Sequence, residues 1–194
     1  MPASFPIWHQ RLPGDVRRRL ELAEARAREA RADTHAAQAL ELVGILAPRM
    51  PFDEAVDRYV EIMGLTGEEE EVVRTRALAL LSNPRTGSEL SSERQRGWGF
   101  DWRYATPLGA LRYIRRQLRR NAEEDLWMEL AAARAEEALI RMHFKHALNF
   151  VEILREEAPP TQAVTLYIDR LQVPSGRARS VYQRVLARLA EKYL

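Results

Sequence analysis

The segment LWMELAAARAEEALIRMHFKHALNFVEIL occupies residues 126–154 and carries the longest helical pattern in the chain. Its apolar residues recur at spacings of three and four, which is the heptad spacing of one side of an α-helix. Asn121 and Glu124 could cap a new helix, or the preceding helix could continue through them. From Asn121 to the residue before Pro159 the helix has about 36 residues and a length of roughly 50 Å. We expect it to pack along its length against other helices or a second subunit. Its predicted seam is Leu126, Leu130, Ala133, Glu137, Ile140, Phe144, Ala147, Val151 and Leu154.

The residues after this segment predict a C-terminal helical hairpin. Thr161 is a candidate N-cap for a helix to about Gln172, residues 173–176 form a turn, and a last helix starts at Arg177. The short turn resembles the connection of a helix-turn-helix, although Ile168 stands where that motif prefers a small residue. The packed positions would be Tyr167, Leu171, Ala178, Val181 and Val185, and the outward face would carry Arg177, Arg184 and Arg188.

The residues before it predict a helix with a basic face. Thr106 and Pro107 are a typical N-cap and first-turn pair. At 100° per residue the arginines that follow gather on one side of the helix, where guanidinium groups suit phosphates. The alternative is that they pair with the acidic stretches at 53–71 and 121–157, or are solvated. These arginines are Arg112, Arg115, Arg116, Arg119 and Arg120.

The N-terminal part of the chain is also helical by its pattern. The residues from Asp15 to about Ala47 predict either one bent helix or two short ones, the second capped by Asp33 and Thr34. A further helix is expected from Phe52 to a left-handed cap at Gly64. The fold class is therefore all-α, a multi-helix bundle of about seven helices. The first helix has an alanine-rich seam, which implies a close helical neighbour: Val16, Leu20, Ala23, Ala27, Ala30, Thr34 and Ala37.

Residues 83–105 interrupt the helical periodicity and predict a connecting loop. An aromatic residue falls at every second position from Trp98, through Phe100 and Trp102, to Tyr104, with glycine or charge between. Flat aromatic rings beside arginine stack on unpaired bases or anchor a protein partner. Alternatively, they are buried and tie two helical halves together.

This loop divides the chain into an N-terminal helical region, 1–82, and a C-terminal helical region, 106–194. A single interlocked domain is the alternative. No repeat at a period of 20 to 50 residues is evident.

Metal and enzyme sites have little support in the sequence. With no cysteine, there is no thiolate zinc site, iron–sulfur cluster or cysteine nucleophile. His143 and His146 share a helix face and are weak candidates for a metal, since the Glu-x-x-His and His-Glu-x-x-His patterns are missing. Phosphate-binding, dinucleotide-binding and serine-hydrolase motifs are also missing. We predict a protein that is not an enzyme and has no cofactor.

Two main functional hypotheses remain, with a helical metal-binding protein around His143 and His146 as a minor alternative. No apolar run of about 18 residues and no export signal occurs, so we expect a cytoplasmic protein without a membrane partner. In the first hypothesis it binds DNA or RNA through its arginine faces. In the second it is an assembly or adaptor protein that docks a protein partner or forms a homo-oligomer, with its acidic and basic segments as complementary surfaces.

Overall fold

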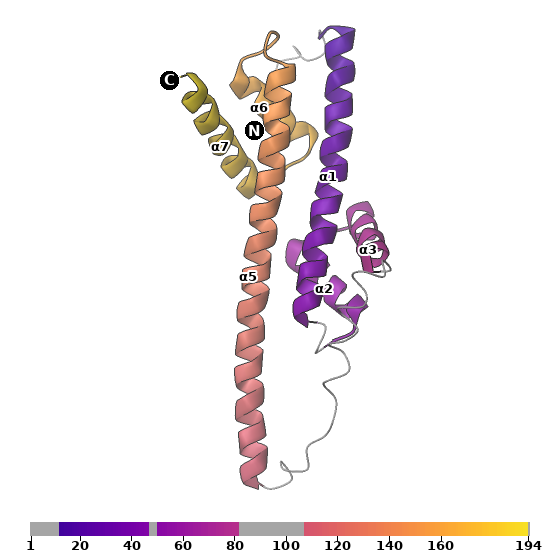
Figure 1. Cartoon of the computed structure of the whole chain (residues 1–194), viewed down its shortest axis with the longest axis vertical. Helices are drawn as coiled ribbons and strands as arrows, with labels where there is room; N and C mark the ends of the chain where they lie inside the picture. The colour runs from indigo at the N-terminus through magenta and orange to yellow at the C-terminus, as the bar shows by residue number, and fades with distance from the viewer. Residues whose placement is uncertain (1–11, 47–49, 82–106, 194) are drawn as a thin grey trace, which may run out of the picture. The chain divides into compact units, whose positions relative to one another are not determined.

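The computed structural model describes residues 12–46, 50–81 and 107–193 of the 194-residue chain (Figure 1). The side chains of Leu81, of residues 107–124 and of residues 192–193 lie outside that description. Every element in the described part is a helix, so the all-α prediction is confirmed. The six helices are α1 (Gly14–Leu46), α2 (Phe52–Met63), α3 (Glu68–Leu81), α5 (Pro107–Ile153), α6 (Pro160–Arg170) and α7 (Ser175–Tyr193).

Most helix ends follow the local sequence signals. α2 ends at Gly64, whose φ of 63° is the left-handed cap that glycine adopts without strain. α5 begins at Pro107 and runs without a break through Asn121, so no new helix starts there. Thr161 is not an N-cap: α6 begins at Pro160, and the cap is Pro159. A first-turn proline has a fixed φ and lacks an N–H, so this start leaves fewer donors to cap.

The chain forms two compact units, and α1 and α5 each contribute to both. Unit 1 comprises residues 1–31 and 137–194, and unit 2 comprises residues 32–136. The division into two helical regions joined by residues 83–105 stays a prediction.

The core of unit 1 lies where α6 and α7 pack on the two long helices. The first half of α1 and the last part of α5 run antiparallel there, with α6 and α7 beside them (Figure 1). Tyr167, Phe150 and Leu154 are fully buried. Of the packed positions predicted for the hairpin, Ala178 is partly buried and the other four are buried: Tyr167, Leu171, Val181 and Val185.

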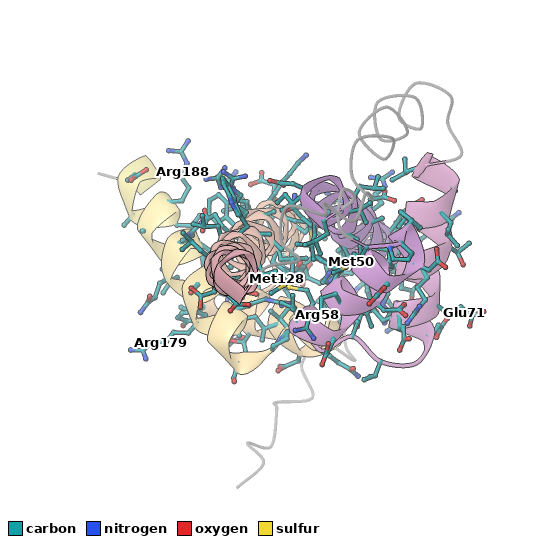
Figure 2. The ribbon with its side chains drawn as sticks, turned by 90° about the horizontal axis from the view of Figure 1, so that it is seen from below. Met50, Arg58, Glu71, Met128, Arg179 and Arg188 are labelled. Carbon is teal, nitrogen blue, oxygen red and sulfur yellow. The ribbon has the colours of Figure 1, made fainter. Side chains whose placement is uncertain are left out.

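The core of unit 2 is formed by the second half of α1, α2, α3 and part of α5. Leu42, Leu46 and Tyr59 are buried in it, and Met50 and Met128 pack against it (Figure 2). Ala131 and Ala135 are the buried residues that α5 supplies.

Both long helices change their buried face between the units, so part of each predicted seam is wrong. In α5 the seam holds from Ile140 to Leu154, but Leu126 and Leu130 are exposed, as is Ala133. In α1 it holds from Val16 to Ala27, whereas Ala37 is exposed. The two halves of each helix contribute to different cores, so a single heptad pattern does not describe the buried residues along the whole helix.

An internal duplication explains why the two units have the same construction. Of the 61 residues from Glu21 to Leu81, 23 are identical to the residue 108 positions later, without a gap. The matches include residues with special roles: Pro51 and Pro159 cap α2 and α6. Gly64 and Gln172, at the same offset, both have positive φ, 63° and 49°. The chain therefore contains two copies of one helical motif, residues 21–81 and residues 129–189.

Equivalent contacts confirm that the two copies share one fold. His35 Nδ1 lies 2.9 Å from the Tyr59 hydroxyl, and His143 Nδ1 lies 2.8 Å from the Tyr167 hydroxyl. The ring planes are inclined at 73° and 71°. Backbone hydrogen bonds repeat as well, at 3.0 Å from Leu65 to Val60 and at 2.9 Å from the equivalent Val173 to Ile168.

Each copy contributes to both units. Ala23 and Ala27 of the first copy are buried in unit 1, and their counterparts Ala131 and Ala135 are buried in unit 2. Each unit thus combines the histidine, tyrosine and helical hairpin of one copy with the alanine-rich helical segment of the other. Small alanine side chains allow this close helix packing.

Candidate interaction surface on α6 and α7

The predicted arginine face of α5 has the expected helical backbone. Residues 107–120 belong to α5, so the periodicity that places Arg112, Arg115, Arg116 and Arg119 on one side applies. Their side chains, and that of Arg120, lie outside the described residues, as do Trp98, Phe100 and Trp102. Their roles stay predictions.

Arg184 on α7 is bound by a carboxylate of its own unit. Its two terminal nitrogens donate to the two oxygens of Glu137 at 2.9 and 2.8 Å, and Arg141 donates to the same carboxylate at 2.9 Å. These hydrogen bonds, the one from Arg184 foremost, lower the pKa of Glu137 to about 2. The hydrogen bond to Glu137 also raises the pKa of Arg184. The bidentate geometry directs the Arg184 donors to the protein itself.

The other two arginines of the predicted α7 face differ in exposure. Arg188 is exposed and pairs with Glu191 at 3.0 Å, while Arg177 is partly buried. Exposed ion pairs are weak and open readily, so Arg188 can still reach a ligand. On the face that was predicted to contact phosphates, Arg184 and Arg188 are therefore both in ion pairs.

The two candidate metal ligands lie in different surroundings. His143 is fully buried, and its ring is oriented by the Tyr167 hydroxyl. Burial raises the pKa of Tyr167, which keeps the hydroxyl protonated and able to donate to Nδ1 when the imidazole carries its proton on Nε2. His146 is partly buried, and burial, together with Lys145, lowers its pKa. Within residues 12–46, 50–81 and 107–193, no cluster of three or more ligating side chains could hold a metal.

An apolar groove lies on the surface between α6 and α7. It has a volume of about 580 Å³ and is open to solvent. Tyr182 and Leu186 of α7 and Ile168 of α6 give it an apolar surface, and each is partly buried. Ala178 and Gln183 complete the lining, and Arg179 provides its charge. Arg179 extends away from α7 into solvent (Figure 2).

The same surface of the first copy is polar. The residues 108 positions earlier are Val60, Glu70, Glu71, Arg74, Thr75 and Leu78.

Arg74 stands at the position of Tyr182 and joins α3 to α2. It bonds Glu70 at 2.8 Å and also bonds Asp57, whose counterpart in the second copy is Thr165. Hydrogen bonding to Glu70 is the largest cause of the raised pKa of Arg74. The ion pair between Arg74 and Asp57 thus spans the first hairpin, where apolar side chains line the second.

The sequence contained a signal for this groove that pattern reasoning missed. Ile168 is too large for the tight packing of a common helix-turn-helix, and it is partly exposed beside Tyr182. An alignment of the chain with itself at the 108-residue offset shows Tyr182 opposite Arg74 and Ala178 opposite Glu70. The second copy keeps the helices of the motif but lacks these two charges, and this difference identifies the groove surface in the sequence.

Comparisons with known proteins identify no relative. No family model, no curated protein and no solved structure matches the chain. In the part of the chain that the structure describes, none of the helices has the length and apolar character needed to span a membrane.

Proposed function

We propose that this protein is a non-enzymatic adaptor or assembly protein that binds a helical segment of a partner protein in the groove between α6 and α7. The observation that carries the proposal is the groove itself, which one copy of the motif has lined with Ile168, Tyr182 and Leu186 while the other has ion pairs there. A partly exposed tyrosine beside an exposed arginine, as Tyr182 lies beside Arg179 here, is typical of protein-binding sites.

A helix is the ligand that fits such a groove. Two packed helices present a trough of apolar side chains, into which a third helix lays residues spaced at i, i+3 and i+7. The apolar area removed from water stabilises the complex by roughly 25 cal/mol per Å² before the entropy of association is subtracted.

Anisotropy of a fluorescein-labelled designed helical peptide, with leucines at i, i+3 and i+7, tests the proposal on the full chain. Leu186→Gln should weaken binding about tenfold, because a leucine contact is worth about 1.4 kcal/mol here. The matched control is Leu78→Gln, the counterpart in the other copy, which is half-exposed and should leave binding unchanged. Equal affinity of both variants and the unsubstituted chain would reject the groove as the binding site.

A second candidate function is nucleic-acid binding through the α5 arginines. The unbroken helical backbone from Pro107 favours it, because the one-sided arginine spacing requires a helix there. Trp98, Phe100 and Trp102 would add the aromatic contact, and Arg177 and Arg188 a second set of phosphate contacts. Arg184 would join them only after leaving Glu137. Anisotropy of labelled DNA and RNA across a salt series tests it: each phosphate neutralised on duplex DNA adds about 0.9 to the log–log slope.

The control for that experiment is the replacement of Arg115, Arg116 and Arg119 by glutamine. Loss of salt-dependent binding in this variant would locate the surface on α5. Absence of binding at low salt would exclude this second candidate and leave the adaptor proposal standing.

A further inference from the structure

Arg179 is the cation at the rim of the α6–α7 groove. Among the described residues no acidic side chain pairs with Arg179, whereas Arg184 pairs with Glu137 and Arg188 with Glu191. An exposed guanidinium next to apolar side chains suits a carboxylate brought by a ligand.

The first copy shows that folding does not need a cation at this position. Glu71 is the counterpart of Arg179, and it extends outward from α3 as Arg179 does from α7 (Figure 2). Both side chains are exposed. Since the motif accepts either charge, the charge at the rim is available to select a ligand.

In the first copy, a network of ion pairs occupies the equivalent surface. Three positions differ together: Asp57, Glu70 and Arg74 form a connected ion-pair network. Thr165, Ala178 and Tyr182 replace them in the second copy. The replacements remove every charge of the network and leave apolar surface in its place, so the groove and the free rim cation occur in the same copy.

We propose that the groove binds an acidic amphipathic helix of a partner protein, whose apolar residues contact Ile168, Tyr182 and Leu186 and whose flanking carboxylate pairs with Arg179. This inference rests on the proposed adaptor function and adds the charge of the partner. A carboxylate beside the apolar anchors gains an ion pair with Arg179, whereas a lysine there meets a like charge.

The test uses the full chain and two labelled helical peptides that share the same leucines and differ only in glutamate or lysine at the flanking position. We expect the glutamate peptide to bind about five- to tenfold more tightly, an effect that shrinks at high salt because the pair is exposed. Arg179→Glu should reverse the preference. The control is Glu71→Arg, which changes the chain's charge by the same amount in the opposite sense on the other copy and should keep the glutamate preference.

A second, independent variant transfers the ion-pair network of the first copy to the α6–α7 groove; we call it the graft. Thr165→Asp, Ala178→Glu and Tyr182→Arg together place the ion-pair network of the first copy on the second. The framework already carries this network at equivalent positions, so circular dichroism should show a folded, helical protein that no longer binds either peptide. The reverse graft, Asp57→Thr with Glu70→Ala and Arg74→Tyr, should leave binding at the α6–α7 groove intact.

The outcomes separate the two proposals. Equal binding of the glutamate and lysine peptides overturns the acidic partner and leaves the adaptor function in place. Binding of neither peptide overturns both. If sedimentation shows self-association that the graft abolishes, and neither peptide binds, the occupant is a second copy of this chain and the partner helix is excluded.

Discussion

The imidazole of His143 and the hydroxyl of Tyr167 form a buried hydrogen bond of 2.8 Å, and the chain contains the same contact a second time between His35 and Tyr59. All four side chains are at most 3% exposed. In each unit the bond joins a long helix to the first helix of a hairpin, α5 to α6 in one and α1 to α2 in the other. It thereby orients the element on which the α6–α7 groove is built.

We predict that Tyr167→Phe destabilises the protein by about 1–3 kcal/mol, because the buried imidazole loses its hydroxyl partner. Tyr59→Phe should have an effect of the same sign and similar size. Urea denaturation followed by circular dichroism measures both. Tyr182→Phe, at a partly exposed position, is the control and should change stability little. A neutral Tyr167→Phe would show that the hydrogen bond does not stabilise unit 1.

The ion pairs of Glu137 predict a stability that depends on pH in the acidic range. Its folded pKa of about 2 lies below the ordinary value of 4.5, so the stabilisation is fully present above pH 4.5 and is lost as the pH falls towards 2. Arg184→Gln should therefore destabilise the protein at pH 7 and have little effect near pH 2. Carboxyl titration by NMR should show the Glu137 midpoint rise in this variant. Arg188→Gln, which removes a fully exposed pair, should leave that midpoint unchanged.

The buried alanines of α1 and α5 predict that a larger side chain lowers the unfolding free energy by a similar amount in each unit. Ala27→Leu in unit 1 and Ala135→Leu in unit 2 each add a large side chain where the alanine is fully buried. We expect each to cost about 1–3 kcal/mol of unfolding free energy in chemical denaturation. Ala25→Leu and Ala133→Leu, an exposed pair at the same offset, should be near neutral. If Ala135→Leu were as neutral as Ala133→Leu, α5 would not be packed in unit 2 as described.

The residue after Leu171, the C-cap of α6, predicts a stabilising substitution. Gln172 has a φ of 49°, the left-handed region that costs a side chain about 1–2 kcal/mol, and its counterpart Gly64 has a φ of 63°. Gln172→Gly should raise stability by about 0.5–1 kcal/mol, after part of the relief is offset by the freedom glycine adds to the unfolded chain. Gly64→Gln should have the opposite effect. Thermal denaturation of the two variants checks both signs, and a destabilising Gln172→Gly would contradict backbone strain at Gln172.

The local chemistry of the sequence was sufficient to predict the helices and several of the residues at which they begin or end. Pro107 starts α5 because proline suits a first helical turn, and Gly64 ends α2 because glycine adopts positive φ. The packed positions of the C-terminal hairpin also followed from spacing, because α6 and α7 each bury one face against a single core.

The buried faces of the long helices could not be predicted in the same way. Leu126 and Leu130 continue the apolar spacing of α5 yet are exposed, and Ala131 and Ala135 are buried instead. The spacing of apolar residues shows which sides of a helix can be buried, but it does not show which other helix covers them. α5 packs against different helices in each unit. The partner of Glu137 was undetermined for the same reason, since Arg184 lies 47 residues away on another helix.

The sequence by itself determined that the protein is all-helical and that it contains one motif twice, since identities at an offset of 108 residues need no coordinates to be found. Only the tertiary structure decided that the alanine-rich segment of each copy completes the core of the other copy's hairpin. It also decided that Tyr182 and Arg179 meet in an open groove. The physical reason is that helix formation depends on neighbours within a few residues, whereas the choice of packing partner depends on contacts between segments far apart in the sequence, such as Arg31 and Leu171, which are 140 residues apart.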